Sequence, residues 1–374
     1  MDAFNPLNKV EAPLSQMLQR SRELVMEFGW NSTSYQIINP GIRHWFSARG
    51  DAVIGYVQHH HFRIVAGAPV CARERLAEIV DEFERDAQRQ HLKVCYFGAE
   101  ARLESHLTPS RRHSMLRLGA QPSWHPARWP DSFSHHASLR AQLNRARNKG
   151  VTVNEWPVEQ ALGHAELYRC LNEWLETRRA PTMHFLIEPY TLDRLYDRRV
   201  FVAERDRRIV GFLIASPVPR RNGWLVEQIV RGAGAVNGTS ELLVDSAVKA
   251  AANIESEYLT LGLSPLSKRG PTGLAVTPLW LQALLAWVRA HGRRFYNFEG
   301  LDAFKAKFQP ERWEPVYAIA NQPRFSPAVL YAIAAAFTGG SPISATARAL
   351  WWAIGQETAA ISARTKLSAK TKQG

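Results

Sequence analysis

The chain has 374 residues, 45% of them hydrophobic and 22% charged, which excludes wholesale disorder and a fibrous architecture. Lysine and arginine total 47 against 34 aspartate and glutamate residues, so the formal net charge is +13, a balance that favours nucleic acid or an anionic membrane surface as partner. The three cysteines form no CxxC pair and fit a reducing cytoplasm. We see no secretory signal at the N-terminus, and the longest apolar run, ten residues at 328–337, falls short of the roughly 20 that a membrane-spanning helix needs.

The first half of the chain predicts strands, then a helix, then a strand. Residues 43–70 alternate short apolar stretches with polar breaks, which is typical of strands joined by tight turns. Residues 93–97 have the composition of a short buried strand. Between them, residues 73–91 predict a helix from apolar side chains at helical spacing: Leu76, Ile79, Val80 and Phe83.

The same order recurs in the second half, after an amphipathic helix predicted at 158–178. Strands are predicted at 199–203, 209–215 and 224–230, a helix at 242–252 and a further strand at 258–263. The chain therefore contains one supersecondary plan twice, with a domain boundary near Trp156 and Pro157, and its fold class is α/β or α+β.

Residues 139–150 (LRAQLNRARNKG) carry four cations and no acid: Arg140, Arg145, Arg147 and Lys149. On a helix, residues four or seven apart share a face, so this stretch predicts a basic stripe suited to phosphates. A solvated helix face explains the pattern about equally well.

Residues 231–241 (RGAGAVNGTSE) place three glycines directly before a predicted helix. Such a junction turns backbone amides and partial positive charge toward a ligand, so it could hold a phosphate or an oxyanion. A plain turn with a Thr or Ser cap is the alternative. Glu241, in the first turn of the helix, is either an ordinary carboxylate favoured by the helix dipole or a group that holds a substrate amine or accepts a proton.

Residues 295–317 mix aromatic residues with Lys305, Lys307 and Arg312. This composition suits base stacking or a lipid headgroup surface, and equally a core with solvated lysines.

We expect no metal site at His59, His60 and His61, because consecutive strand residues point to opposite faces. Neither a GxSxG elbow nor a HExxH motif occurs.

Three stretches in order resemble the C-terminal catalytic domain of the phosphatidylglycerol lysyltransferase/alanyltransferase (aminoacyl-phosphatidylglycerol synthase) family. They are 139–150, 236–251 (VNGTSELLVDSAVKAA) with 261–266 (LGLSPL), and 295–320 (FYNFEGLDAFKAKFQPERWEPVYAIA). GAPV at 67–70 and the helix after it also resemble the family's first half, so the likeness covers roughly residues 30–320.

The resemblance implies a tandem pair of acetyltransferase-like (GNAT) domains that moves an aminoacyl group from aminoacyl-tRNA to a lipid hydroxyl, usually that of phosphatidylglycerol, without a metal or other cofactor. It implies catalytic roles for Glu241, Lys305, Asp302 and Arg231. Substrate-binding roles fall to Asn237, Gly238, Thr239 and Lys307, and tRNA or phosphate binding to Arg140, Arg145, Arg147 and Lys149. The family commonly has paired arginines before the Asn-Gly turn, where this chain has Val230 and Arg231.

We expect five segments: a helical lead-in at 1–29, two GNAT-like domains at 30–156 and 157–322, membrane-surface amphipathic helices at 323–356, and a disordered basic tail at 357–374. Trp351 and Trp352 suit the membrane interface, and the chain is expected in the cytoplasm, peripheral on the inner face of the membrane. The alternative is that these helices pack on the core.

Two other functions remain open from the sequence. One is an acyl-CoA-dependent N- or O-acyltransferase, in which the glycine-rich turn would cradle pyrophosphate. The other is a non-catalytic basic module that binds tRNA or membrane. Neither the amino acid transferred nor the lipid acceptor can be assigned from the sequence.

Overall fold

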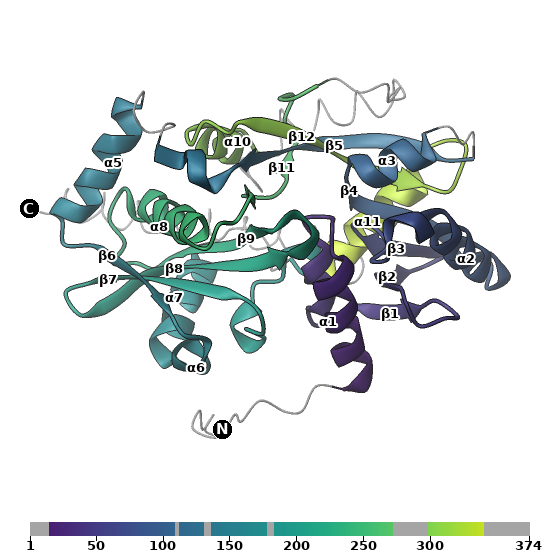
Figure 1. Ribbon diagram of the computed structural model, residues 1–374, viewed down its shortest axis with the longest axis horizontal. Helices are drawn as coiled ribbons and strands as arrows, with labels where there is room; N and C mark the ends of the chain where they lie inside the picture. Colours follow the sequence, from purple (N-terminus) through teal and green to yellow (C-terminus); the bar gives the residue numbers. More distant parts are fainter. Residues whose placement is uncertain (1–14, 109–111, 131–135, 178–182, 272–297, 340–374) are drawn as a thin grey trace, which may run out of the picture.

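The computed structural model describes residues 15–108, 112–130, 136–177, 183–271 and 298–339. Its strands form one mixed sheet in the order β1-β2-β3-β4-β12-β5-β10-β9-β8-β7-β6, with β11 paired to β5 (Figure 1). The strands are β1 (Arg43–Phe46), β2 (Val53–His59), β3 (Phe62–Ala66), β4 (Lys93–Ala99), β5 (Ser114–Trp124), β6 (Thr152–Trp156), β7 (Arg199–Arg205), β8 (Arg208–Val218), β9 (Gly223–Arg231), β10 (Tyr258–Thr260), β11 (Ser264–Pro265) and β12 (Arg312–Ala320). The α-helices are α1 (Gln16–Phe28), α2 (Leu76–Arg89), α3 (Ala101–Leu107), α5 (Ala137–Asn148), α6 (Val158–Ala161), α7 (Ala165–Glu176), α8 (Thr239–Asn253), α10 (Phe298–Ala306) and α11 (Pro327–Thr338).

The chain repeats one plan, as its sequence predicts. In the first repeat β1, β2 and β3 are antiparallel neighbours, and α2 connects β3 to the parallel strand β4. In the second repeat β7, β8 and β9 are antiparallel neighbours, and α8 connects β9 to the parallel strand β10. The α/β fold class and the doubled order of elements are therefore confirmed.

The two repeats share their sheet. Strand β12, which follows the second repeat in sequence, pairs with β4 on one side and β5 on the other. Strand β5 also pairs with β10. Helix α5 and strand β6 precede residue 157 but contact α8 and β7 of the second repeat. A division at residues 156 and 157 stays a prediction, but strand pairing places β6 with the second repeat, and the contact with α8 places α5 there too.

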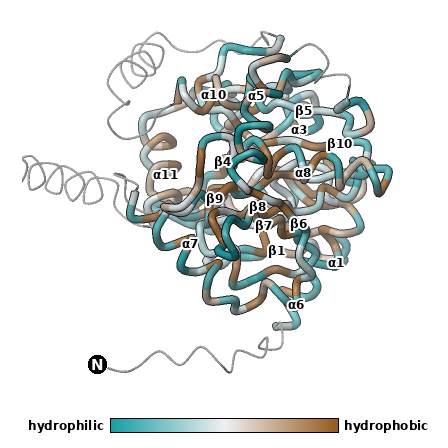
Figure 2. Tube along the Cα trace, turned by 90° about the vertical axis from the view of Figure 1, so that its left-hand side faces the viewer, coloured by the Kyte–Doolittle hydropathy of each residue, from teal (hydrophilic) through white to brown (hydrophobic). Residues whose placement is uncertain are grey.

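Alternating side chains give the sheet two buried faces in each repeat. In β7, Val200 and Val202 join one core cluster, whereas Phe201 and Ala203 join another. Helices α7 and α8 contribute to these two clusters respectively, so they cover opposite faces of β7, β8 and β9. Figure 2 shows the hydrophobic residues concentrated along these strands.

Two predicted helices differ from expectation. The helix predicted at 158–178 is interrupted after α6, because Gly163 adopts a left-handed conformation with φ of 69°. Residues 323–356 were expected on a membrane surface, but α11 buries Val329, Ala332 and Ile333 in the first repeat's core. The structure thus corrects that expectation for α11, whereas Trp351, Trp352 and the tail at 357–374 lie outside the described residues.

No helix in the described ranges has both the length and the apolar character needed to span a bilayer.

Candidate functional site

The glycine-rich turn and the start of α8 are covered by α5. Gly238 has φ of 98°, a left-handed conformation that glycine adopts without strain. A Cβ atom at this position would lie 2.2 Å from the main-chain oxygen of Gln142 and 3.2 Å from the Cβ atom of Ala146. Because residue 238 is a glycine, the main chain of α5 can pack directly against the main chain of the turn.

Several amides of this turn already have acceptors within the protein. The amide of Ala233 donates to the Glu173 carboxylate at 2.9 Å. The amides of Gly232, Ala235 and Thr239 donate to main-chain carbonyls, and the Thr239 hydroxyl donates to the carbonyl of Val236 at 2.8 Å. These amides therefore already have acceptors within the protein. This disfavours phosphate binding at the turn, although its glycines would allow it.

Glu241 lies in the first turn of α8, where its side chain is 10% exposed. Lys307, just after α10, donates from Nζ to Glu241 Oε1 at 2.8 Å and to the Gln142 side-chain oxygen at 3.0 Å. Segments far apart in sequence thus meet at one polar point. The half-buried pair is a carboxylate held in place by a cation, which suits binding of an amine or proton exchange.

Lys305 is buried at the end of α10, two residues before Lys307. Its Nζ donates to the carbonyl oxygens of Gly262 and Leu263, at 2.9 and 2.8 Å. Burial lowers the pKa of Lys305 to about 7, although the charge of Asp302 acts in the opposite direction. An amine that titrates near neutrality is suited to both accepting and donating a proton.

Asp302 faces the segment after β10. One carboxylate oxygen accepts from the Ser264 hydroxyl at 3.1 Å, and the other accepts from Arg269 Nε at 2.8 Å. Burial by itself would raise the pKa of Asp302, but hydrogen bonds from Ser267, Arg269 and Ser264 outweigh it and lower the pKa. Asp302 is therefore an ionised residue that orders the segment against which Lys305 packs.

The four basic residues predicted to bind phosphate, three on α5 and Lys149 directly after it, do not act alike. Arg147 pairs with the buried Asp245 of α8 at 2.9 Å, and Asp245 also accepts from Trp129 Nε1 at 3.0 Å. Arg147 thus anchors α5 on α8. The side chains of Arg140, Arg145 and Lys149 are exposed.

Arg231 ends β9, and Asn237 lies in the turn before α8. Both side chains are exposed. Of the predicted site residues, the structure brings Glu241 into contact with Lys307, and it places Asp302 close enough to Lys305 for their charges to interact.

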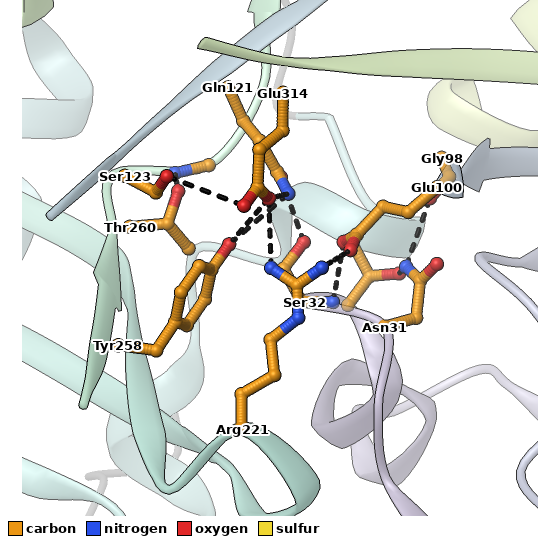
Figure 3. A network of polar contacts seen from close by, with 12 residues as sticks. Asn31, Ser32, Gly98, Glu100, Gln121, Ser123, Arg221, Tyr258, Thr260 and Glu314 are labelled. Atoms are coloured by element: carbon orange, nitrogen blue, oxygen red, sulfur yellow. Dashed lines mark hydrogen bonds and ion pairs between the residues drawn. The ribbon is translucent and has the colours of Figure 1, made fainter. Parts of the chain in front are cut away.

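A second polar cluster, which the sequence did not indicate, joins the two repeats (Figure 3). Arg221 donates to Glu100 at 2.9 Å and to Glu314 at 2.8 Å, and its guanidinium lies 4.3 Å from the ring centre of Tyr258. Burial opposes charge on both Arg221 and Glu314, yet the attraction of Glu100 and Glu314 raises the pKa of Arg221, and the attraction of Arg221 lowers the pKa of Glu314. Glu314 lies in the family motif at 295–320 and Tyr258 in a predicted strand, but the partners are scattered along the chain, so no local pattern indicates that they meet.

The family model for the C-terminal domain of phosphatidylglycerol lysyltransferase matches residues 22–320. The chain belongs to this family. The match covers both repeats and includes Glu241, Asp302, Lys305 and Lys307.

Other members of the phosphatidylglycerol lysyltransferase C-terminal family are similar in sequence. A phosphatidylglycerol lysyltransferase of Bacillus subtilis is 24% identical over 302 residues, which are 80% of this chain and 34% of that protein. The lysylphosphatidylglycerol biosynthesis bifunctional protein LysX of a Mycobacterium species is 28% identical over 232 residues, 58% of this chain and 20% of that protein. The chain spans about a third or less of the length of these two relatives.

Solved structures share the fold of this family member. The C-terminal domain of a lysylphosphatidylglycerol synthetase from Agrobacterium fabrum superposes with a TM-score of 0.73 and 23% identity, covering 87% of this chain and 98% of that one. L-PGS from Bacillus licheniformis gives a TM-score of 0.68 and 20% identity with the same coverage. These likenesses confirm the fold expected from the family resemblance.

Proposed function

We propose that this chain transfers an aminoacyl group from aminoacyl-tRNA to a hydroxyl of phosphatidylglycerol. The observation that carries the proposal is the family match over both repeats, which includes the pair formed by Glu241 and Lys307 and the buried Lys305 at the end of α10. The relatives named as phosphatidylglycerol lysyltransferases support the same lipid acceptor. The amino acid itself is left open.

The reaction exchanges one ester for another. The lipid hydroxyl oxygen attacks the aminoacyl carbonyl carbon, the bond from that carbon to the tRNA ribose oxygen breaks, and the hydroxyl proton passes to the departing ribose oxygen. Because the donor is already an ester, the protein's contribution is positioning, charge stabilisation and a path for the proton. We therefore propose no resident metal or other cofactor.

The site residues suit separate parts of this reaction. Glu241, held by Lys307, is placed to bind the ammonium group of the aminoacyl donor or to take up a proton. Lys305 supplies an amine that exchanges protons at neutral pH, and Asp302 keeps the segment at Ser264 in place. The exposed cations Arg140, Arg145 and Lys149 are proposed to contact tRNA phosphates.

Roles for the remaining predicted residues follow from their positions. Arg231 and Asn237 are exposed near the start of α8 and are proposed to contact the donor or the lipid phosphate. Gly238 is proposed to position α5 by allowing its close approach, and Thr239 to hold the turn through its hydrogen bond to Val236. We further propose that the protein works in the cytoplasm at the inner face of the membrane, with Trp351 and Trp352 at the interface.

The packing of α5 disfavours an acyl-CoA donor. Pyrophosphate binding at the turn would need free amides and open space, whereas Glu173 already accepts from Ala233 and the Gln142 carbonyl lies against Gly238.

Incubation of the purified chain with total charged tRNA and phosphatidylglycerol vesicles tests the proposal. Mass spectrometry of the extracted lipids should reveal phosphatidylglycerol heavier by one aminoacyl group, and the added mass identifies the amino acid. Vesicles of phosphatidylcholine, which has no free glycerol hydroxyl, serve as the acceptor control. Unmodified phosphatidylglycerol after incubation with every aminoacyl-tRNA would contradict the proposal.

A further inference from the structure

The main chain that binds Lys305 is anchored by one buried threonine. Lys305 Nζ donates to the carbonyl oxygens of Gly262 and Leu263 at 2.9 and 2.8 Å. Among the described residues, these two carbonyls are the hydrogen-bond acceptors of the amine. Strand β10 ends two residues before Gly262, at Thr260, which is fully buried. The contacts that hold residues 260–263 in place therefore also determine where the Lys305 amine lies.

The Thr260 hydroxyl makes two hydrogen bonds with the main chain. Its oxygen accepts from the amide of Gly262 at 3.0 Å, and it donates to the carbonyl of Pro122 at 2.7 Å. Pro122 lies on β5, which pairs with β10 and with β12, and Figure 3 shows Thr260 beside its ladder partner Ser123. One side chain thus joins the turn after β10 to the strand between the two repeats. Valine has nearly the same shape as threonine but can make neither bond.

Gly262 is the residue at which the chain turns after β10. Its φ of 69° is left-handed, and an added Cβ would lie 3.1 Å from Leu225 Cδ1 on β9. The Gly262 amide donates to Thr260, and the Gly262 carbonyl accepts from Lys305. Because both groups belong to one residue, fixing the amide restricts where the carbonyl can lie.

The two carbonyls also affect the proton affinity of Lys305. Burial lowers the pKa of this lysine to about 7, and Asp302 is the charged group that acts against burial. Hydrogen bonds from the protonated amine to carbonyl oxygens favour the charged form, as Asp302 does. Displacement of the Gly262 carbonyl would therefore move the amine and lower its pKa further.

We propose that Thr260 is a positioning residue for Lys305: its hydroxyl holds the Gly262 carbonyl where it accepts the hydrogen bond from the amine. Thr260 is buried and binds main-chain groups, so it acts through Lys305 and not by contact with a substrate. Its effect on aminoacyl transfer rests on the proposed function above. Its effect on the location and the pKa of the amine does not.

Replacement of Thr260 by valine tests the effect on transfer. We expect Thr260→Val to lower kcat by about tenfold or more with little change in KM, because the amine is displaced while the substrate contacts stay. Thr260→Ser keeps the hydroxyl and should restore most of the rate. Thr191→Val is the matched control, since it removes another buried hydroxyl, which donates to the Gln228 side-chain oxygen at 2.6 Å, and it should keep the unmodified rate. A folded Thr260→Val protein with the unmodified rate would overturn the proposal.

The pH dependence of unfolding gives a readout that needs no activity. In the unmodified chain the free energy of unfolding should start to rise with pH near 7, where the folded Lys305 loses its proton. In Thr260→Val this rise should start about 0.5 to 1 pH unit lower, which corresponds to the loss of one hydrogen bond. Thr260→Ser and Thr191→Val should show the rise at the unmodified pH. In proteins that also carry Lys305→Met, the effect of Thr260→Val on this onset should vanish.

The two readouts separate the positioning role from the proposed function. Absence of transfer by the unmodified chain, together with a lower onset in Thr260→Val, would contradict the proposed function and support the positioning role. The same onset in Thr260→Val and the unmodified chain would overturn the positioning role. If Thr260→Val does not fold, Gly262→Ala takes its place, because the added Cβ would displace the same carbonyl. An unchanged onset in that variant would reject the proposal.

Discussion

Lys305 is a buried lysine, and burial lowers the pKa of its amine to about 7. Two main-chain carbonyls accept its hydrogen bonds, so the protonated form is held in place, while burial favours the neutral form. Both forms are therefore populated at neutral pH. This balance is what a group that relays a proton between two hydroxyl oxygens requires.

Loss of either Lys305 or Glu241 should slow transfer strongly. We expect Lys305→Ala and Glu241→Gln each to reduce turnover by about a hundredfold or more, the scale of general acid-base or charge-stabilising groups. Initial rates of aminoacyl-lipid formation, measured on variants shown to be folded, check this. Lys93→Ala, an exposed lysine on β4, is the control. Near-normal turnover in both site variants would show that neither residue takes part in the reaction.

The low pKa of Lys305 also predicts how stability depends on pH. In the unfolded chain this lysine has its ordinary pKa of 10.5, so between about pH 7 and 10.5 the unfolded state binds one proton more than the folded state. The free energy of unfolding therefore increases as pH rises through this window and decreases again as pH falls toward 7. Lys305→Met should remove this part of the slope, as denaturant unfolding of both proteins from pH 7 to 9.5 would measure. Parallel slopes for the two proteins would show that Lys305 is not held at a low pKa.

Helix α5 depends on close contact with the turn before α8. Gly238→Ala should lower the free energy of unfolding by about 3 kcal/mol, from the left-handed backbone and the overlap with the Gln142 carbonyl. Gly150→Ala is a matched control, because Gly150 has φ of 80° but no atom within 4 Å of an added Cβ. It should cost about 1 kcal/mol. Equal losses in denaturant unfolding would mean that α5 does not pack on the turn as described.

Elements with a clear local pattern could be predicted from the sequence. Helix α2 and strands β7 to β9 lie within a few residues of their predicted ranges, because periodic apolar residues match the period of each element. The interruption at Gly163 was missed, since a single glycine in an amphipathic pattern does not reveal its φ angle. The burial of α11 depends on a partner surface in the first repeat, which no local pattern specifies.

The candidate site was predictable only in part for the same reason. Family motifs single out Glu241, Lys305 and Lys307, but their pairing depends on how distant segments fold together. Arg147 belongs to a basic stripe in sequence, whereas in the structure it pairs with Asp245. The Arg221 cluster draws on residues from both repeats, and although Glu314 lies in the 295–320 motif, no local pattern joins it to Arg221 and Glu100.

At the scale of the whole molecule, the two repeats form one structural unit. Strand β12 pairs within the first repeat's sheet, and Arg221 bridges Glu100 and Glu314. Helix α11 then returns to the first repeat's core. Helix α11 is thus part of the core, and a membrane contact by the residues that follow it stays a prediction.

Deletion of residues 340–374 tests that location. The shortened chain keeps α11 and should unfold at the temperature of the intact chain, but it should lose binding to phosphatidylglycerol vesicles in co-sedimentation, because it loses Trp351, Trp352 and the cations of the tail. Vesicles of phosphatidylcholine control for charge-independent binding. Unchanged sedimentation of the folded, shortened chain would place the membrane contact elsewhere.

The identity of the donor is the most direct test of the proposed function. Purified protein, radiolabelled aminoacyl-tRNA and phosphatidylglycerol vesicles are incubated with and without prior RNase digestion, and label in the extracted lipid is counted. We predict label in the lipid that disappears after complete digestion of the tRNA and that acyl-CoA does not restore. Transfer that persists after digestion and instead follows added acyl-CoA would contradict the account.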